Sequence, residues 1–199
     1  MAGWYNPEIH HRQSIRLKGY EYSRKGAYFV TICTWNRECL FGNISDGQMV
    51  LNGAGKIVGR VWEDLPARFP SVELDVFGVM PNHVHGIIAI VGAGLAPPNT
   101  RVQQAAPLQA LPQKGAAGSA PTLGDVVRAF KSISAIRVNG HLSRSGQPLW
   151  QRNYYEHIIR TDDELNRIRQ YIRDNPMSWL EDRENPSAQV KKVQEPWRV

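Results

Sequence analysis

The order of strand-type and helix-type segments constrains the fold of this chain more than any other feature of the sequence. β-branched and aromatic residues dominate 28–35, which predicts a strand. Apolar residues then recur at helical spacing from Ile57 to Leu65, and two prolines follow that should close the helix. The runs 72–80 and 83–91 are again strand-like, and the short Pro-Asn break between them predicts a hairpin.

The second half of the chain repeats this alternation. Helical spacing returns over 123–138, and 149–159 predicts a fourth strand. Thr161 and Glu164 have the spacing of a capping box and begin a helix that should end before Pro176. The first six elements therefore predict an α+β fold, a ferredoxin-like βαββαβ antiparallel sheet with its helices on one face. The last helix is an addition at the C-terminal end.

Length and composition are consistent with one domain over residues 1–199. Ala, Pro, Gln and Gly dominate about 92–121, which predicts a flexible insertion because the segment offers little to bury. The longest purely apolar stretch, 87–91, falls far short of the ~20 residues that a membrane helix needs. No signal peptide pattern opens the chain, and its two cysteines form no disulfide framework. We therefore expect a soluble, cytoplasmic protein with no membrane partner.

The charge balance favours a polyanionic partner. The chain carries 24 Lys and Arg against 18 Asp and Glu, a formal net charge of +6, and its pI is about 9.5. A pI in this range is typical of proteins that bind nucleic acid, although a basic surface attracts other polyanions as well.

The sequence His83-Val-His85 is the most informative candidate for a chemical site. Alternate residues of a strand share a face, so the two imidazoles should project about 6–7 Å apart and can converge on one metal ion. Gly86 follows and should leave room for a ligand to approach the backbone. Two polar residues on the exposed side of a hairpin would give the same pattern. A His-x-His nucleotide hydrolase is disfavoured, because Ile87 stands where a third alternating histidine is needed.

Tyrosines supply the candidate nucleophiles. Tyr171 and Asn175 lie four residues apart on the last predicted helix and therefore share a face beside its apolar stripe. Tyr154 and Tyr155, with His157, lie on the predicted fourth strand and are rivals for the same role. Aromatic packing at the edge of a core explains any of the three equally well.

The chain resembles the HUH single-tyrosine transposases, and within them the REP-associated tyrosine transposases and their close bacterial relatives. The resemblance runs from about 6 to 179, apart from the Ala/Pro/Gln segment. It is carried by Asn6-Pro-Glu-Ile-His-His-Arg12, Phe29-Val-Thr-Ile-Cys-Thr-Trp-Asn-Arg37, Val79-Met-Pro-Asn-His-Val-His-Gly86, Trp150-Gln-Arg-Asn-Tyr-Tyr-Glu-His-Ile-Ile-Arg160 and Tyr171-Ile-Arg-Asp-Asn-Pro176.

This resemblance implies a division of roles at the site. His83 and His85 would bind a divalent metal, Mg²⁺ or Mn²⁺, with Asn175 as a further ligand. Tyr171 would be the catalytic nucleophile on the added helix. It would cut single-stranded DNA next to a hairpin through a 5′-phosphotyrosine intermediate and then transfer the strand.

Basic residues near the site are expected to contact phosphate. They come from the N-terminal arm and from the last helix: Arg12, Arg16, Lys18, Arg24, Lys25, Arg167, Arg169 and Arg173. The alternative is a non-catalytic nucleic-acid-binding module that stacks bases on a ferredoxin-like sheet. The sequence leaves open whether the protein is a monomer or a homodimer, and which hairpin it recognises.

Overall fold

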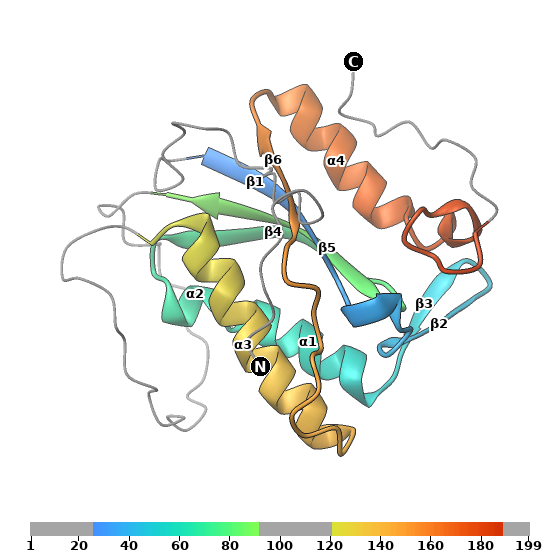
Figure 1. Cartoon of the computed structure of the whole chain (residues 1–199). Helices are drawn as coiled ribbons and strands as arrows, with labels where there is room; N and C mark the ends of the chain where they lie inside the picture. Colours follow the sequence, from blue (N-terminus) through green and yellow to red (C-terminus); the bar gives the residue numbers. More distant parts are fainter. Residues whose placement is uncertain (1–25, 92–120, 189–199) are drawn as a thin grey trace, which may run out of the picture.

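The computed structural model describes residues 26–91 and 121–188 of the chain (Figure 1). Its main sheet has four strands: β1 (Gly26–Cys33), β4 (Val72–Val79), β5 (His83–Ile90) and β6 (Tyr155–Ile159). They lie in the order β4-β5-β1-β6, and every neighbouring pair is antiparallel. This is the strand order of a ferredoxin-like sheet, so the predicted α+β fold is confirmed.

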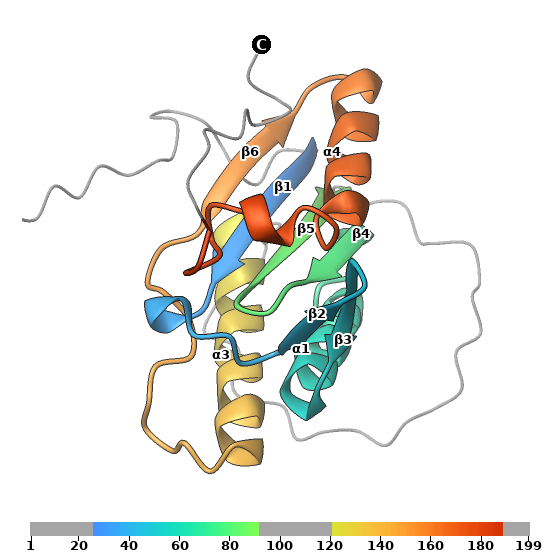
Figure 2. The ribbon, with the colours of Figure 1, turned by 90° about the vertical axis from the view of Figure 1, so that its right-hand side faces the viewer.

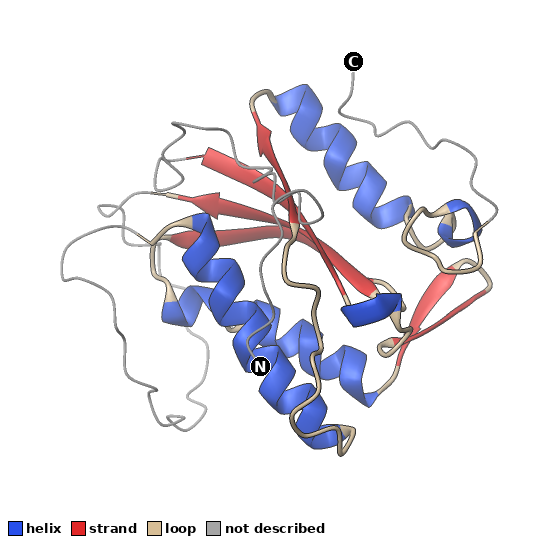
Figure 3. Ribbon diagram, in the orientation of Figure 1, coloured by secondary structure: helices blue, strands red, loops and turns tan. Residues whose placement is uncertain are grey.

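Helices cover both faces of this sheet. The helices α1 (Gly53–Glu63) and α3 (Leu123–His141) pack on one face, and α4 (Asp162–Asp174) lies across the other (Figures 1 and 2). Three one-turn elements complete the helical part (Figure 3): α2 (Leu65–Arg68), η1 (Trp35–Arg37) and η2 (Trp179–Glu181). Two short antiparallel strands, β2 (Gly42–Ser45) and β3 (Gln48–Leu51), form a separate ribbon.

The sheet separates two apolar cores. The larger lies under α1 and α3 and contains Trp62 and Phe130, whose rings meet edge to face with their centroids 5.3 Å apart. The smaller lies under α4 and consists of Phe29, Ile87, Ile168 and Ile172. Because apolar residues of α4 are fully buried there, hydrophobic burial holds this helix on the sheet. The added C-terminal helix is therefore a packed element of the fold.

The predicted fourth strand, 149–159, is shorter in the structure. Only Tyr155–Ile159 pairs with β1, and before it a single bridge joins Trp150 to Thr34. Trp150 turns into the larger core, where its Nε1 donates a hydrogen bond to Ser134 Oγ at 2.9 Å. Because this indole packs in the larger core, the segment before Tyr155 lies away from the edge of the sheet.

The boundaries of other helices and strands also differ from the predicted ones, for reasons that lie in the local sequence. The first strand ends at Cys33 rather than at 35, because the chain enters the turn η1. Pro66 does not close α1 but lies in the first turn of α2. A proline is tolerated there because the N–H groups of the first turn make no hydrogen bonds within the helix. The sequence analysis did not predict the ribbon of β2 and β3. Its two strands are short and lie on either side of a polar turn at Asp46-Gly47, so their residue pattern is too weak to indicate strands.

Some predictions lie outside the described residues. These are the phosphate contacts of Arg12, Arg16, Lys18, Arg24 and Lys25, and nearly all of the predicted insertion at about 92–121. Within 26–91 and 121–188, none of the helices is both long enough and apolar enough to cross a bilayer.

Candidate metal centre and nucleophile

His83 and His85 lie at the beginning of β5 and face the layer that contains α4. Their ring nitrogens Nε2 are 2.9 Å apart, and both side chains are buried. The prediction that alternate strand positions bring the two imidazoles together is correct. The alternative of two exposed polar residues does not hold, because His83 has no exposed surface.

Asn82 fixes the tautomer of His83. The Asn82 Nδ2 group donates to two backbone oxygens, those of Arg37 at 3.1 Å and Glu184 at 2.6 Å. Both of its hydrogens are therefore used, and Oδ1 is the atom that faces His83 Nδ1 at 2.8 Å. Nδ1 must donate to this oxygen, so His83 Nε2 presents a lone pair to the site.

Thr31 orients the second histidine. Its Oγ1 lies 2.8 Å from His85 Nδ1, and Thr31 is the direct partner of His85 across the β1–β5 pair. The hydroxyl can accept from Nδ1–H, which again leaves Nε2 as the nitrogen that points inward. Both histidines thus have a polar partner behind the ring, the arrangement that metal-binding histidines use.

Asp182 is a third buried group at this site, and the sequence analysis did not identify it. One carboxylate oxygen, Oδ2, lies 3.9 Å from His83 Nε2. The ligand atoms of His83, His85 and Asp182 all lie within 4.8 Å of one another. The chain reaches this position just after η2, and nothing in its local pattern distinguishes Asp182 from Glu181 beside it.

Asn175 contributes an unusual oxygen to the same place. Its Nδ2 donates to Asp182 Oδ2 at 3.1 Å. Its Oδ1 is buried, and no hydrogen bond to it forms within the described ranges. A buried carboxamide oxygen without a donor is costly in an apolar setting, and a bound cation would satisfy it. The role of Asn175 as a metal ligand stays a prediction, and a buried oxygen of this kind is one that a cation could use.

The electrostatics keep the two histidines neutral. Burial lowers the pKa of His83, while the nearby carboxylates of Asp182 and Glu184 oppose that shift. Burial, followed by the proximity of His83, lowers the pKa of His85 well below its ordinary value. Neutral imidazoles hold the lone pairs that a metal requires.

These residues fit a divalent cation. Two nitrogen ligands at about 2.1 Å from an octahedral ion lie about 3 Å apart when adjacent, close to the observed separation of the two Nε2 atoms. Asp182 adds one negative charge and an oxygen donor, and Asn175 a second oxygen. The buried His-His-Asp group can therefore bind a metal ion.

Tyr171 lies at the edge of the same cluster. Its hydroxyl oxygen is 3.5 Å from His85 Nε2. Its ring meets the rings of His85 and Phe29 edge to face, at centroid distances of 5.2 and 6.1 Å. The aromatic contacts hold the phenol ring, and the hydroxyl points to the nitrogen that faces the metal centre.

The rival tyrosines lie elsewhere. Tyr154 precedes β6 and packs against the larger core on the opposite side of the sheet. Tyr155 shares the face of the histidines, but two strand spacings separate it from His85, or about 10 Å between Cα atoms. His157 is paired with Glu164 at 2.7 Å, far along β6 from the metal centre. Of these three tyrosines, Tyr171 is the one whose hydroxyl oxygen is placed 3.5 Å from a ring nitrogen of the His-His-Asp group.

An ion pair and a glycine position α4. Both carboxylate oxygens of Asp75 on β4 accept hydrogen bonds from Arg169 Nε at 3.1 Å. A Cβ on Gly78 would lie 3.1 Å from Ile172 Cγ2, so glycine allows the helix to approach β4 closely. Of the predicted phosphate contacts on this helix, Arg169 thus has a structural partner, while Arg167 and Arg173 lie on its exposed side.

The role predicted for Gly86 is wrong. A Cβ at this position would lie 2.3 Å from Cζ2 of Trp62 and 3.1 Å from Phe77. Those two rings stack with centroids 4.4 Å apart on the side of the sheet away from the histidines. Gly86 therefore makes room for the core indole and not for a ligand.

The sequence and the structure of the chain were compared with those of known proteins. No protein-family profile matches the chain. An uncharacterized protein of Haemophilus influenzae is 46% identical over 184 residues, which cover 92% of this chain and 97% of that one. Among solved structures, a REP-associated tyrosine transposase bound to a REP hairpin superposes with a TM-score of 0.51 and 17% identity, over 83% of this chain and 74% of that chain. The chain therefore belongs to one family with the Haemophilus influenzae protein, and its structure matches the fold of the REP-associated tyrosine transposases.

Proposed function

We propose that the protein is a metal-dependent nuclease and strand transferase that acts on single-stranded DNA next to a hairpin. One observation carries the proposal: the hydroxyl of Tyr171 lies 3.5 Å from the ring nitrogen of His85 that faces the buried His-His-Asp group. The solved structure with the same fold is a transposase bound to a REP hairpin, which supports a similar DNA substrate. We place this activity in the cytoplasm.

His83, His85 and Asp182 would hold the cation, with the carboxamide oxygen of Asn175 as a fourth ligand. Mixed imidazole and oxygen donors suit Mn²⁺ better than Mg²⁺, so either ion should work and Mn²⁺ should bind more tightly. A bound cation would polarise the scissile phosphate and offset the charge that develops on its oxygens.

Tyr171 would supply the covalent chemistry. Its phenol has an ordinary pKa near ~10, so it must lose its proton to attack at neutral pH. Attack forms a bond between the phenol oxygen and phosphorus and breaks the bond from phosphorus to the 3′ oxygen, which takes up a proton to balance the one that the phenol gives up. The products are a 5′-phosphotyrosine and a free 3′-hydroxyl. A second 3′-hydroxyl can reverse the reaction on a new strand, so no nucleotide cofactor is needed.

Basic residues would bind the DNA backbone around this centre. The N-terminal arm would supply Arg12, Arg16, Lys18, Arg24 and Lys25, and the exposed side of α4 would supply Arg167 and Arg173. The alternative of a module that stacks bases on an open sheet has little support. Both faces of the described sheet are covered, one by α1 and α3 and the other by α4 (Figure 2).

The test compares Tyr171→Phe with Tyr155→Phe. The proteins are incubated with a pool of hairpin-bearing single strands and Mn²⁺, and covalent adducts are separated by denaturing electrophoresis. We expect the wild type and Tyr155→Phe to form an adduct, and Tyr171→Phe to bind DNA but form none. The loss of stability in Tyr171→Phe should stay near the ~1 kcal/mol of one hydrogen bond.

Two controls define the result. His83→Ala combined with His85→Ala, or a chelator with the wild type, should abolish the adduct while hairpin binding persists. Peptide mapping of the wild-type adduct should find DNA on the fragment that contains Tyr171. DNA on Tyr154 or Tyr155 would refute the nucleophile, and an adduct formed in the presence of chelator would refute the metal site.

A further inference from the structure

We propose that Trp35 is a stacking platform for an unpaired base of the DNA strand that passes the metal centre. The inference rests on the proposed function and adds a residue that positions the substrate. Trp35 opens the turn η1 and is 44% exposed. The other tryptophans of the described ranges pack inward: Trp62 and Trp150 belong to the larger core, and Trp179 is half-buried beside His83.

The backbone that presents this indole is strained. Asn36 and Arg37 follow Trp35 with φ of 53° and 56°, in the left-handed region, which asparagine tolerates but arginine rarely adopts. Two such residues in succession persist only where the surroundings hold them, and they gather at functional sites.

The turn is held in place by a network of hydrogen bonds. The Trp35 amide donates to Leu149 O at 2.8 Å, and the Thr34 amide donates to Asn82 O at 2.8 Å. Asn82 Nδ2 donates to Arg37 O, and Arg37 Nε pairs with Glu184 Oε2 at 3.1 Å. The half-exposed indole is therefore presented by a braced turn, which lowers the entropy lost when a base stacks on it.

The same network connects the indole to the metal centre. Asn82, which holds the turn, is also the residue that orients the ring of His83. Cys33 is the direct partner of His83 across the β1–β5 pair, and Trp35 lies two residues further along the chain. Figure 2 shows η1 at the end of β1, beside the segment that carries Asp182. The backbone of Trp35 thus lies close to that of His83, and the proposal places a base next to the scissile phosphate on the Trp35 indole.

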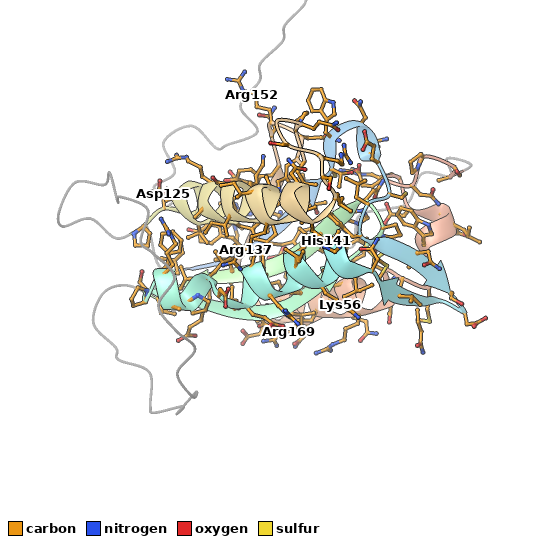
Figure 4. The ribbon with its side chains drawn as sticks, turned by 90° about the horizontal axis from the view of Figure 1, so that it is seen from below. Lys56, Asp125, Arg137, His141, Arg152 and Arg169 are labelled. Atoms are coloured by element: carbon orange, nitrogen blue, oxygen red, sulfur yellow. The ribbon has the colours of Figure 1, made fainter. Side chains whose placement is uncertain are left out.

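One basic side chain on the surface beyond Trp35 suits the phosphates of such a strand. Leu149, whose carbonyl oxygen accepts the Trp35 amide, lines a surface cavity of about 470 Å³ together with Arg152 on the α3 side of the sheet. The other two cations of the lining have partners: Lys131 Nζ donates to the carbonyls of Gln151 and Arg152, and Arg128 pairs with Asp125. Figure 4 shows Arg152 on the outer side of α3, pointing away from the ribbon. An aromatic platform beside a basic surface is the arrangement by which proteins bind single-stranded nucleic acid without reading its sequence.

The experiment measures DNA binding without cleavage. The full-length protein is titrated in chelator against a fluorescent DNA hairpin that carries a tail of roughly ten thymines, and against the same hairpin without a tail. Trp35→Leu keeps an apolar side chain but removes the ring, and Trp35→Phe keeps a ring. Ile136→Ala, at a 64% exposed apolar position of α3, is the matched control. Thermal melting confirms that each variant is folded.

We expect Trp35→Leu to weaken binding of the tailed hairpin about tenfold and leave the untailed hairpin unaffected, with Trp35→Phe close to the wild type. An abasic site scanned along the tail should reproduce the loss at one position, and there Trp35→Leu should cause no further loss. Equal affinity of Trp35→Leu and the wild type for the tailed hairpin, or an equal loss in the Leu and Phe variants, would overturn the proposal. Failure of the proposed function would give a different result: neither the wild type nor any Trp35 variant would form a covalent adduct with DNA in the presence of Mn²⁺.

Discussion

At the scale of single residues, the partners behind the two histidines matter as much as the histidines themselves. Asn82 has both amide hydrogens on backbone oxygens, so its remaining oxygen determines which nitrogen of His83 is protonated. Thr31 holds the ring of His85 in place through Nδ1, but its hydroxyl can donate or accept and so does not select the tautomer. Because these partners turn both Nε2 atoms inward, the centre is prepared for a cation before one binds.

Asp182 provides the residue-scale prediction. Replacing it with Asn removes the one negative charge in the His-His-Asp group and should weaken Mn²⁺ binding at least about tenfold. Isothermal titration of the folded protein measures this affinity. Glu181→Gln, which removes the adjacent exposed carboxylate, should leave the affinity unchanged. Equal Mn²⁺ affinities of the wild type and Asp182→Asn would exclude Asp182 as a ligand.

At the scale of elements, α4 is held by apolar packing and by one ion pair. Ile168 and Ile172 bury the inner face of the helix, and Arg169 reaches Asp75 on β4. Thr161 caps the helix as predicted, with its Oγ1 accepting from the Glu164 amide at 3.2 Å. The Glu164 carboxylate accepts from the Arg160 amide and lies against His157, so it ties α4 to β6. The position of Tyr171 thus depends on contacts to all four strands of the main sheet.

The ion pair yields a pH prediction. Hydrogen bonds from Arg169 hold the pKa of the Asp75 carboxyl below its ordinary value of 3.8. Because the folded state favours the ionised form, the pair stabilises the protein above that value, and the stabilisation is lost as the pH falls through the lowered pKa. At pH 7, Asp75→Asn should reduce the free energy of unfolding by about 1 kcal/mol, the upper end for a partly exposed pair.

Denaturant unfolding at several pH values checks this prediction. The difference between the wild type and Asp75→Asn should be constant from pH 5 to 7 and should shrink below the ordinary pKa of the Asp75 carboxyl, 3.8. Glu73→Gln, on the same strand but exposed, is the control. A difference that persists undiminished at low pH would mean that Asp75 acts through packing rather than charge.

At the scale of the whole molecule, one chain brings all the proposed catalytic groups together. Tyr171 and His85 are 86 positions apart in sequence, and their side chains meet within the same fold. Asp182 and Asn175 come from the end of the described chain and join the same cluster. Within the described residues of one chain, the nucleophile and the possible metal ligands lie in the same cluster.

Mixing inactive variants should therefore not restore activity. Tyr171→Phe supplies an intact metal centre, and His83→Ala with His85→Ala supplies an intact nucleophile. If both groups act within one chain, an equimolar mixture should form no adduct beyond the level of either variant alone. An adduct that appears on mixing would show that the tyrosine of one chain acts at the metal centre of another.

The predicted insertion provides a second test at this scale. Its Ala, Pro, Gln and Gly composition offers little to bury, and the elements described on either side are β5 and α3. Replacing 93–119 by a short Gly/Ser linker should change the melting temperature by no more than about a few degrees. Deleting residues within α3 would serve as the destabilising control. Insoluble protein from the linker variant would contradict the prediction that the insertion is dispensable for folding.

The sequence by itself determined the order of the elements, the shared face of His83 and His85, and the one-turn spacing of Tyr171 and Asn175. These features follow from the periods of strands and helices, which act between near neighbours in the chain. The tertiary structure alone decided the place of Asp182, the tautomer set by Asn82 and the use of Gly86 by Trp62. Such contacts join residues as far apart as Asn82 and Glu184, 102 positions in sequence, and depend on how whole elements pack. No local pattern encodes them, because the same short segment would have different neighbours in another fold.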